Sequence, residues 1–257
     1  LPRNVLYAAN LHFLNAVPWA VPVLAAYLWC YWRYLRGEGP PDSTRDLRRT
    51  RLRANRVSGR AWVWSLLAGG LGIVALVLAL RLVNRLVVLP PQEVPDLSQV
   101  PALTLWTLVL LGAPVAGLVE EAAFRGYMQG PIERRFGLTL AILITGTMFA
   151  VSHLDFTLIL WPYYVAVAAL YGTVTWLCNS IWPTVVLHTL GNTWSNSNLL
   201  LYGQAEWQAS ADPSELVWTT GADETFVRQA VTLVVVAAAT AWAYSRLAGA
   251  TRRLRSP

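Results

Sequence analysis

The chain has 257 residues, of which 55% are hydrophobic and 13% are charged, roughly half the charged share of a soluble globular domain. All 20 basic residues are arginines and the formal net charge is +6. In a chain this apolar, we interpret the placement of the basic clusters first as a sign of membrane topology and only then as a sign of nucleic-acid binding. The two cysteines lie in apolar stretches, which excludes a disulfide-rich secreted protein and a zinc ribbon. The 13 tryptophans and 10 tyrosines suit the interfacial belts of a bilayer protein.

Apolar windows long enough to form transmembrane helices recur along the chain, each needing about 20 residues. Windows with almost no charge are Val5–Trp32, Ala61–Leu80, Leu97–Val119, Gly137–Leu154 and Phe226–Ser245. Prolines 18 and 22 can kink or split the first of them.

A further stretch, Phe156–Ala205, has no formal charge and is too long for one helix across a core of about 30 Å. We expect two spans there, broken near Cys178-Asn179-Ser180 and restarted around Pro183, since proline is tolerated in a first helical turn. The sequence therefore predicts an all-α fold, a polytopic integral membrane helical bundle with about seven transmembrane helices.

The basic residues predict which ends of the spans are cytoplasmic. The segment 33–60 has nine arginines against three acidic residues, and four more arginines follow Ser245. By the positive-inside rule both regions are cytoplasmic, as is the C-terminus. Alternation then places Arg134 and Arg135 inside. It places the acidic residues Glu206, Asp212, Glu215, Asp223 and Glu224 outside, together with Arg81 and Arg85, which Glu93 and Asp96 offset. We interpret the basic segment as a topology signal attracted to anionic lipid, with no nucleic-acid partner.

Charged residues buried in a bilayer are costly, so their presence indicates function. The third window ends in Glu120 and Glu121, and the apolar pattern continues past them to Met128. On an α-helix Glu121 shares a face with Arg125 four residues later, whereas Glu120 is rotated about 100° away. We therefore expect an ion pair between Glu121 and Arg125. Glu120 is left free to act as a general base, the alternative being two acids solvated at a helix end.

Two further spans each carry a pair of residues four apart. Phe149 precedes His153 by one turn, so its ring can pack against the imidazole. His188 precedes Asn192 by one turn, which presents two polar side chains on one helical face. If the spans converge in the bundle, Glu120 can deprotonate a water that His153 helps to orient. His188 and Asn192 can then donate hydrogen bonds to an oxyanion, which describes peptide-bond hydrolysis.

A zinc site is the alternative, with Glu120, His153 and His188 as three ligands and an open position for water. No two histidines lie on one helix as in a His-Glu-x-x-His motif, so nothing local assembles such a site. We therefore favour a glutamate mechanism that requires no cofactor.

The three motifs, Glu120-Glu121-x-x-x-Arg125, Phe149-x-x-x-His153 and His188-x-x-x-Asn192, occur in this order on successive spans. In this respect the chain resembles the CPBP intramembrane proteases, also called the CAAX amino-terminal protease or Abi family, which include the Ras-converting enzymes. The resemblance covers about residues 103–202. It implies a helical membrane fold with a cavity in the bilayer. It also implies a catalytic site of six residues, Glu120, Glu121, Arg125, His153, His188 and Asn192. The family has been described both as metalloproteases and as glutamate proteases, so the resemblance leaves the metal open.

We thus divide the chain into N-terminal helices with the arginine-rich loop (1–100), a protease-like core (101–205) and an outer loop, final span and basic tail (206–257). The predicted function is intramembrane endopeptidase cleavage of membrane-associated peptides or proteins. A non-catalytic scaffold or bacteriocin-immunity protein and a secondary transporter are the alternatives. The arginine-only composition is typical of a GC-rich genome, so we expect a prokaryotic plasma membrane. Because the chain does not begin with methionine, we expect a processed or trimmed N-terminus.

Overall fold

The computed structural model describes residues 2–89, 96–153, 158–203 and 216–252, and within these ranges all regular secondary structure is helical, which confirms the predicted class. The α-helices are α1 (Pro2–His12), α2 (Ala20–Leu35), α3 (Arg45–Arg51), α4 (Gly59–Leu86), α5 (Ala102–Glu120), α6 (Gln129–Ser152), α7 (Trp161–Cys178), α8 (Trp182–Tyr202), α9 (Val217–Thr220) and α10 (Glu224–Thr251). A π-helix, η2 (Glu121–Met128), joins α5 to α6, and short 3-10 turns, η1 (Asp42–Thr44) and η3 (Leu158–Leu160), precede α3 and α7.

Four helical stretches among the described residues are long and apolar enough to cross a membrane, so the predicted count of seven is not confirmed. They are Gly59–Leu86, Ala102–Ser152, Leu158–Cys178 and Glu224–Thr251. The second has 51 residues and covers two of the predicted spans. Its chain direction changes at Gly137, where φ is +84°, a backbone angle that glycine adopts without steric cost.

The first predicted span, Val5–Trp32, is divided into two helices. α1 has 11 residues and α2 has 16, and each is shorter than the roughly 20 residues that cross a bilayer. Asn10 holds the intervening turn, because its side-chain amide donates to the carbonyl of Val17 and its oxygen accepts from the backbone N–H of Ala20. The proline-containing turn therefore splits this window, as the sequence allowed.

The break between α7 and α8 lies where the sequence predicts it. α7 ends at Cys178, Asn179 adopts a left-handed conformation with φ of +47°, and α8 begins at Trp182 with Pro183 in its first turn. The segment before α4 supports this turn, because the backbone N–H of Ile181 donates to the carbonyl of Arg53 at 3.0 Å.

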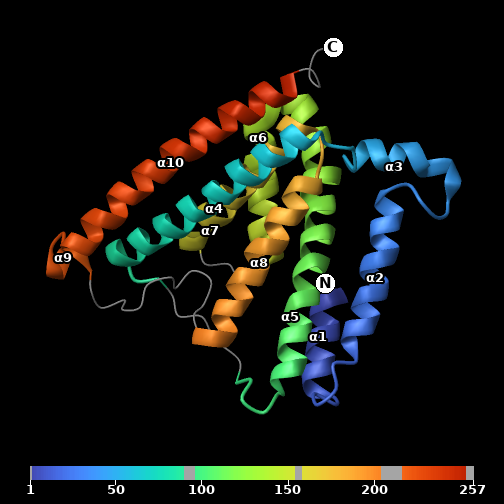
Figure 1. Cartoon of the computed structure of the whole chain (residues 1–257), viewed down its shortest axis with the longest axis horizontal. Helices are drawn as coiled ribbons and strands as arrows, with labels where there is room; N and C mark the ends of the chain where they lie inside the picture. Colours follow the sequence, from blue (N-terminus) through green and yellow to red (C-terminus); the bar gives the residue numbers. More distant parts are fainter. Residues whose placement is uncertain (1, 90–95, 154–157, 204–215, 253–257) are drawn as a thin grey trace.

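The helices pack in pairs, α4 along α10, α6 along α7 and α5 along α8. α3 and the C-terminal end of α10 lie at the same end of the molecule, and α9 lies at the opposite end (Figure 1). The described parts of the two basic regions therefore share one end, in line with the positive-inside pattern. Which compartment this end faces stays a prediction, and Glu93, Glu206, Asp212, Glu215 and the last tail arginines lie outside the described residues.

A close contact between α5 and α8 sets the position of the functional motifs. A Cβ atom at Gly117 would lie 2.7 Å from the hydroxyl oxygen of Thr189 and 3.0 Å from the carbonyl oxygen of Val185. Only glycine allows these two helices to approach so closely. Gly117 lies one turn before Glu121, the first residue of η2, and Val185 and Thr189 flank His188 on α8, so the contact brings the two motifs together.

Candidate active site

The two adjacent glutamates differ in environment. The Glu121 side chain has no solvent exposure, whereas 26% of the Glu120 side chain is exposed. Glu121 begins the π-helix η2, and single turns of this kind are often found at functional sites. The sequence predicts that the helix continues past the glutamates, and the structure confirms this. The sequence does not predict that the continuing turns have π-helical geometry.

The predicted ion pair between Glu121 and Arg125 is present. Oε1 of Glu121 lies 3.3 Å from Nη1 of Arg125, and both side chains are fully buried. The guanidinium also lies over the ring of Phe149, 5.0 Å from its centroid, and near the ring of Tyr171 at 5.6 Å. A carboxylate and aromatic faces therefore stabilise the buried cation.

His188 connects the two glutamates. Its Nδ1 lies 2.9 Å from Oε1 of Glu121, and its Nε2 lies 3.6 Å from Oε2 of Glu120. The ring also stacks on Tyr171 with centroids 5.4 Å apart. If Glu121 is ionised it can only accept, so Nδ1–H donates to it and Nε2 is directed toward Glu120. The sequence did not predict this bridge, because it joins residues 67 positions apart.

His153 is the residue that follows α6 directly, and the chain also fixes its ring orientation. Its Nδ1–H donates to the carbonyl oxygen of Phe149 at 2.8 Å, since that oxygen can only accept. The ring packs against Phe149 at 4.6 Å and against Tyr164 at 4.7 Å between centroids. In a neutral ring Nε2 is then the acceptor nitrogen. The predicted packing of Phe149 on His153 is thus confirmed.

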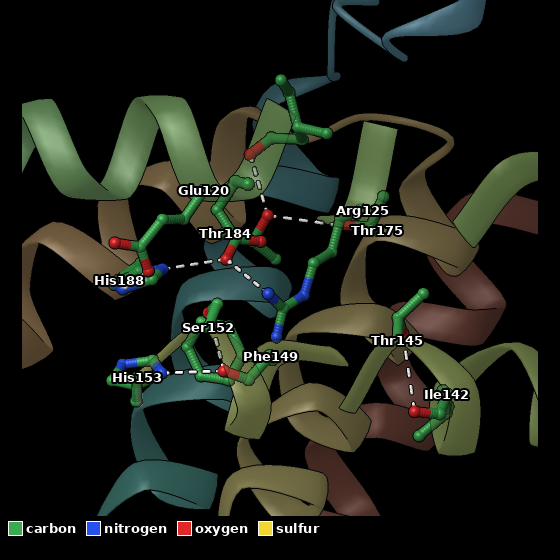
Figure 2. Close-up of polar contacts among 12 residues, drawn as sticks. Glu120, Arg125, Ile142, Thr145, Phe149, Ser152, His153, Thr175, Thr184 and His188 are labelled. Carbon is green, nitrogen blue, oxygen red and sulfur yellow. Dashed lines mark hydrogen bonds and ion pairs between the residues drawn. The ribbon is translucent and has the colours of Figure 1, made fainter. Parts of the chain in front are cut away.

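These side chains meet at one cavity of about 200 Å³. Glu120, His153, His188 and Asn192 all line it, and they come from the end of α5, the end of α6 and the middle of α8. Figure 2 shows Glu120, His153 and His188 on one side of the view and Arg125 on the other. Four of the six predicted site residues therefore share the cavity, whereas Glu121 and Arg125 lie behind it.

The cavity also has residues that the sequence did not single out. Tyr164 and Tyr171 of α7 line it and contact His153 and His188 respectively. Nothing in the sequence distinguishes them from the other aromatic residues of that apolar helix. Ile73 and Val77 of α4 give the opposite wall an apolar character.

The predicted zinc ligands are near one another but do not form a metal-binding group in this structure. Among the described residues, no three His, Cys, Asp or Glu side chains are placed so that they could hold a metal ion. The Nδ1 atoms of His153 and His188 contact a carbonyl oxygen and Glu121 respectively, which leaves Nε2 of each ring as the nitrogen open to another ligand. The placement of the His, Cys, Asp and Glu side chains in the described part of the chain does not assemble a three-ligand zinc site.

Comparison with known proteins agrees with the motifs. Residues 102–194 match the family model described as "Rce1-like: Type II CAAX prenyl endopeptidase Rce1-like", and this range includes all six predicted site residues. Neither the curated proteins nor the solved structures gave a match to the chain. Together with its apolar helices, the match identifies an integral membrane protein. Over this segment the chain is Rce1-like, which confirms its resemblance to the CPBP/CAAX protease family.

Proposed function

We propose that the protein is an intramembrane endopeptidase of the CAAX-protease type, which hydrolyses peptide bonds of membrane-associated peptides or proteins. The observation that carries the proposal is the convergence of Glu120, His153, His188 and Asn192 on one cavity within the Rce1-like segment. A carboxylate, two imidazoles and an amide in a confined space supply a base, proton carriers and an oxyanion donor.

In the proposed mechanism Glu120 is the general base. Its partly exposed carboxylate takes a proton from a water molecule in the cavity, and the resulting hydroxide attacks the carbonyl carbon of the scissile peptide bond. Nε2 of His153 accepts a hydrogen bond from the water and orients it. When the tetrahedral intermediate collapses, the C–N bond breaks and the proton held by Glu120 passes to the leaving amine.

Asn192 and His188 stabilise the oxyanion in this mechanism. The Asn192 amide donates as it is, whereas His188 donates from Nε2 only as an imidazolium, because its Nδ1–H already bonds to Glu121. The two carboxylates on either side of the ring balance that positive charge. Glu121 is therefore a positioning residue that fixes the ring of His188, and Arg125 fixes Glu121.

We propose that the reaction requires no metal ion. The support is the lack of a three-ligand group among the His, Cys, Asp and Glu side chains of the described residues. In this arrangement Glu120, rather than a metal, has to lower the barrier for water attack.

The test is cleavage of a quenched membrane-peptide library by the purified, detergent-solubilised protein. Glu120→Gln should abolish cleavage, whereas Glu224→Gln, at an exposed position in the first turn of α10, should leave it unchanged. Normal cleavage by Glu120→Gln would refute the base assignment. No cleavage by the wild type of any library member would instead favour a non-catalytic scaffold.

A further inference from the structure

An apolar groove lies on the side of α8 that does not face the catalytic cavity. It has a volume of about 560 Å³ and is lined by residues of α2, α4, α5 and α8, among them Trp29, Trp32, Trp62 and Trp182. It shares no lining residue with the catalytic cavity. The groove is therefore a separate space from the cavity at Glu120.

A basic hollow of about 500 Å³ continues the groove toward α3. Trp32 and Trp182 line both, so the two spaces adjoin. The lining of the hollow has four arginines, Arg36, Arg45, Arg49 and Arg56, against one acidic residue, Glu38. Together the two spaces are amphipathic, with an indole-lined half and a cationic half.

Two of the four arginines already have acidic partners. Arg36 pairs with Glu38 at 3.1 Å, and Arg45 pairs with Asp42 at 3.3 Å. In the described part of the chain, Arg49 and Arg56 have neither a hydrogen bond nor an ion pair through their side chains. Both are exposed, so the hollow has two guanidinium groups available to an anion.

We propose that the groove and the adjoining hollow together bind one anionic phospholipid. Its phosphate lies in the hollow between Arg49 and Arg56, and an acyl chain lies in the groove along the tryptophans. Guanidinium groups bind phosphate oxygens in a bidentate manner, and basic pockets at the cytoplasmic ends of membrane helices bind anionic head groups. The adjoining indoles explain why a lipid fits better than a free anion, since a phosphate ion would leave the apolar half empty. This site goes beyond the proposed protease function and does not depend on it.

Quenching of tryptophan fluorescence by lipids with brominated acyl chains tests the site. The protein is held in nonionic detergent micelles, and brominated phosphatidylglycerol or phosphatidylcholine is titrated in. The detergent is uncharged, so general attraction to an anionic surface contributes little while the added lipid is a small fraction of each micelle. We expect phosphatidylglycerol to quench at clearly lower concentrations than phosphatidylcholine.

The double variant Arg49→Gln/Arg56→Gln should weaken phosphatidylglycerol binding by roughly 30-fold, on the basis of about fivefold for each basic residue. The matched control, Arg51→Gln/Arg60→Gln, removes the same charge from exposed positions of the same segment that do not line the hollow. It should bind as the wild type does. Ala25→Trp, which fills the apolar half, should weaken the binding of both lipids.

Equal weakening by the two double variants would overturn the proposal, because the effect would then be net charge rather than a site. Equal binding of the two lipids by the wild type would also overturn it. Complete displacement of phosphatidylglycerol by millimolar inorganic phosphate would show that the hollow recognises phosphate alone, which contradicts a lipid site.

Discussion

Substituting each of the adjacent glutamates in turn gives the sharpest test of the site. Glu121→Gln removes the anion from a pair whose side chains are both fully buried, whereas Glu120→Gln alters a side chain that is 26% exposed. The two changes are chemically identical and lie one residue apart. We expect the first to reduce stability and the second to abolish cleavage while leaving stability almost unchanged.

The size of the first effect follows from the geometry of the pair. Two unit charges at the observed 3.3 Å attract by about 5 kcal/mol at an effective dielectric constant near 20. Removal of one partner of a buried pair costs about 3–5 kcal/mol, because the other charge is left uncompensated. Since 1 kcal/mol shifts the melting temperature by about 2–4 °C in a domain of this size, the expected loss is roughly 6–20 °C.

The assay is thermal unfolding of the detergent-purified protein, followed by tryptophan fluorescence, with cleavage measured on the same samples. Glu120→Gln should unfold within about 1 kcal/mol of the wild type, because a partly exposed contact is worth little. The double variant Glu121→Gln/Arg125→Met should recover most of the lost stability, since it leaves no uncompensated charge. It should not recover cleavage, because His188 still lacks the carboxylate that fixes its ring.

Unfolding of Glu121→Gln at the wild-type temperature, or a lower stability of Glu120→Gln than of Glu121→Gln, would show that the buried ion pair does not stabilise the fold. Recovery of both stability and cleavage by the double variant would show that Glu121 does not position His188.

Three further predictions concern acid stability, packing and metal dependence. Hydrogen bonding from Arg85, which lies 2.7 Å from Asp223, holds the pKa of that carboxyl below its usual range. The stabilisation is therefore complete above about pH 4, the unfolded value, and is lost as the pH falls through the lowered pKa. The difference in melting temperature between wild type and Asp223→Asn should accordingly shrink below pH 4, and a constant difference would contradict this. Gly126→Ala should cost about 1–3 kcal/mol, because its Cβ would lie 2.8 Å from the backbone carbonyl oxygen of Leu52. Gly130→Ala is the control and should be tolerated, because its Cβ would lie 3.5 Å from the flexible end of the Arg134 side chain. Finally, cleavage by the wild type should survive a strong chelator; loss on chelation and recovery with zinc would argue against the proposed glutamate mechanism.

The sequence predicts helices well where the signal is local. Windows of helical length with almost no charge account for α4, α7 and α10, and the tolerance of proline in a first turn accounts for the start of α8. The helix boundaries within the window Val5–Trp32 are harder to predict, because hydropathy alone does not show where a backbone turn interrupts an apolar run. There the turn is held by the side chain of Asn10, which pairs with backbone groups on both sides of the interruption.

The same distinction applies to the candidate site. The ion pair between Glu121 and Arg125 follows from a spacing of four residues within one helix, so the sequence predicts it. The bridge from His188 to both glutamates depends on how closely α5 and α8 approach, which no local pattern determines. Arg85 illustrates this too. The sequence gives no partner for Arg85 and only counts Glu93 and Asp96 as acids that offset its charge, whereas the structure pairs it with Asp223, which is 138 residues away in the chain.

The segment just before α4 lies outside the Rce1-like range and still contacts the elements that carry the site. The carbonyl of Arg53 accepts from the N–H of Ile181 at the start of α8, and its guanidinium pairs with Glu133 at 2.7 Å where both side chains are nearly buried. Leu52 packs its backbone on Gly126 within the π-helix. One short segment therefore holds both the helix that begins with Glu121 and the helix that carries His188. Because the distance between these two side chains is only 2.9 Å, a small shift of either helix would break their hydrogen bond. The geometry of the site thus depends on residues that the family match does not include.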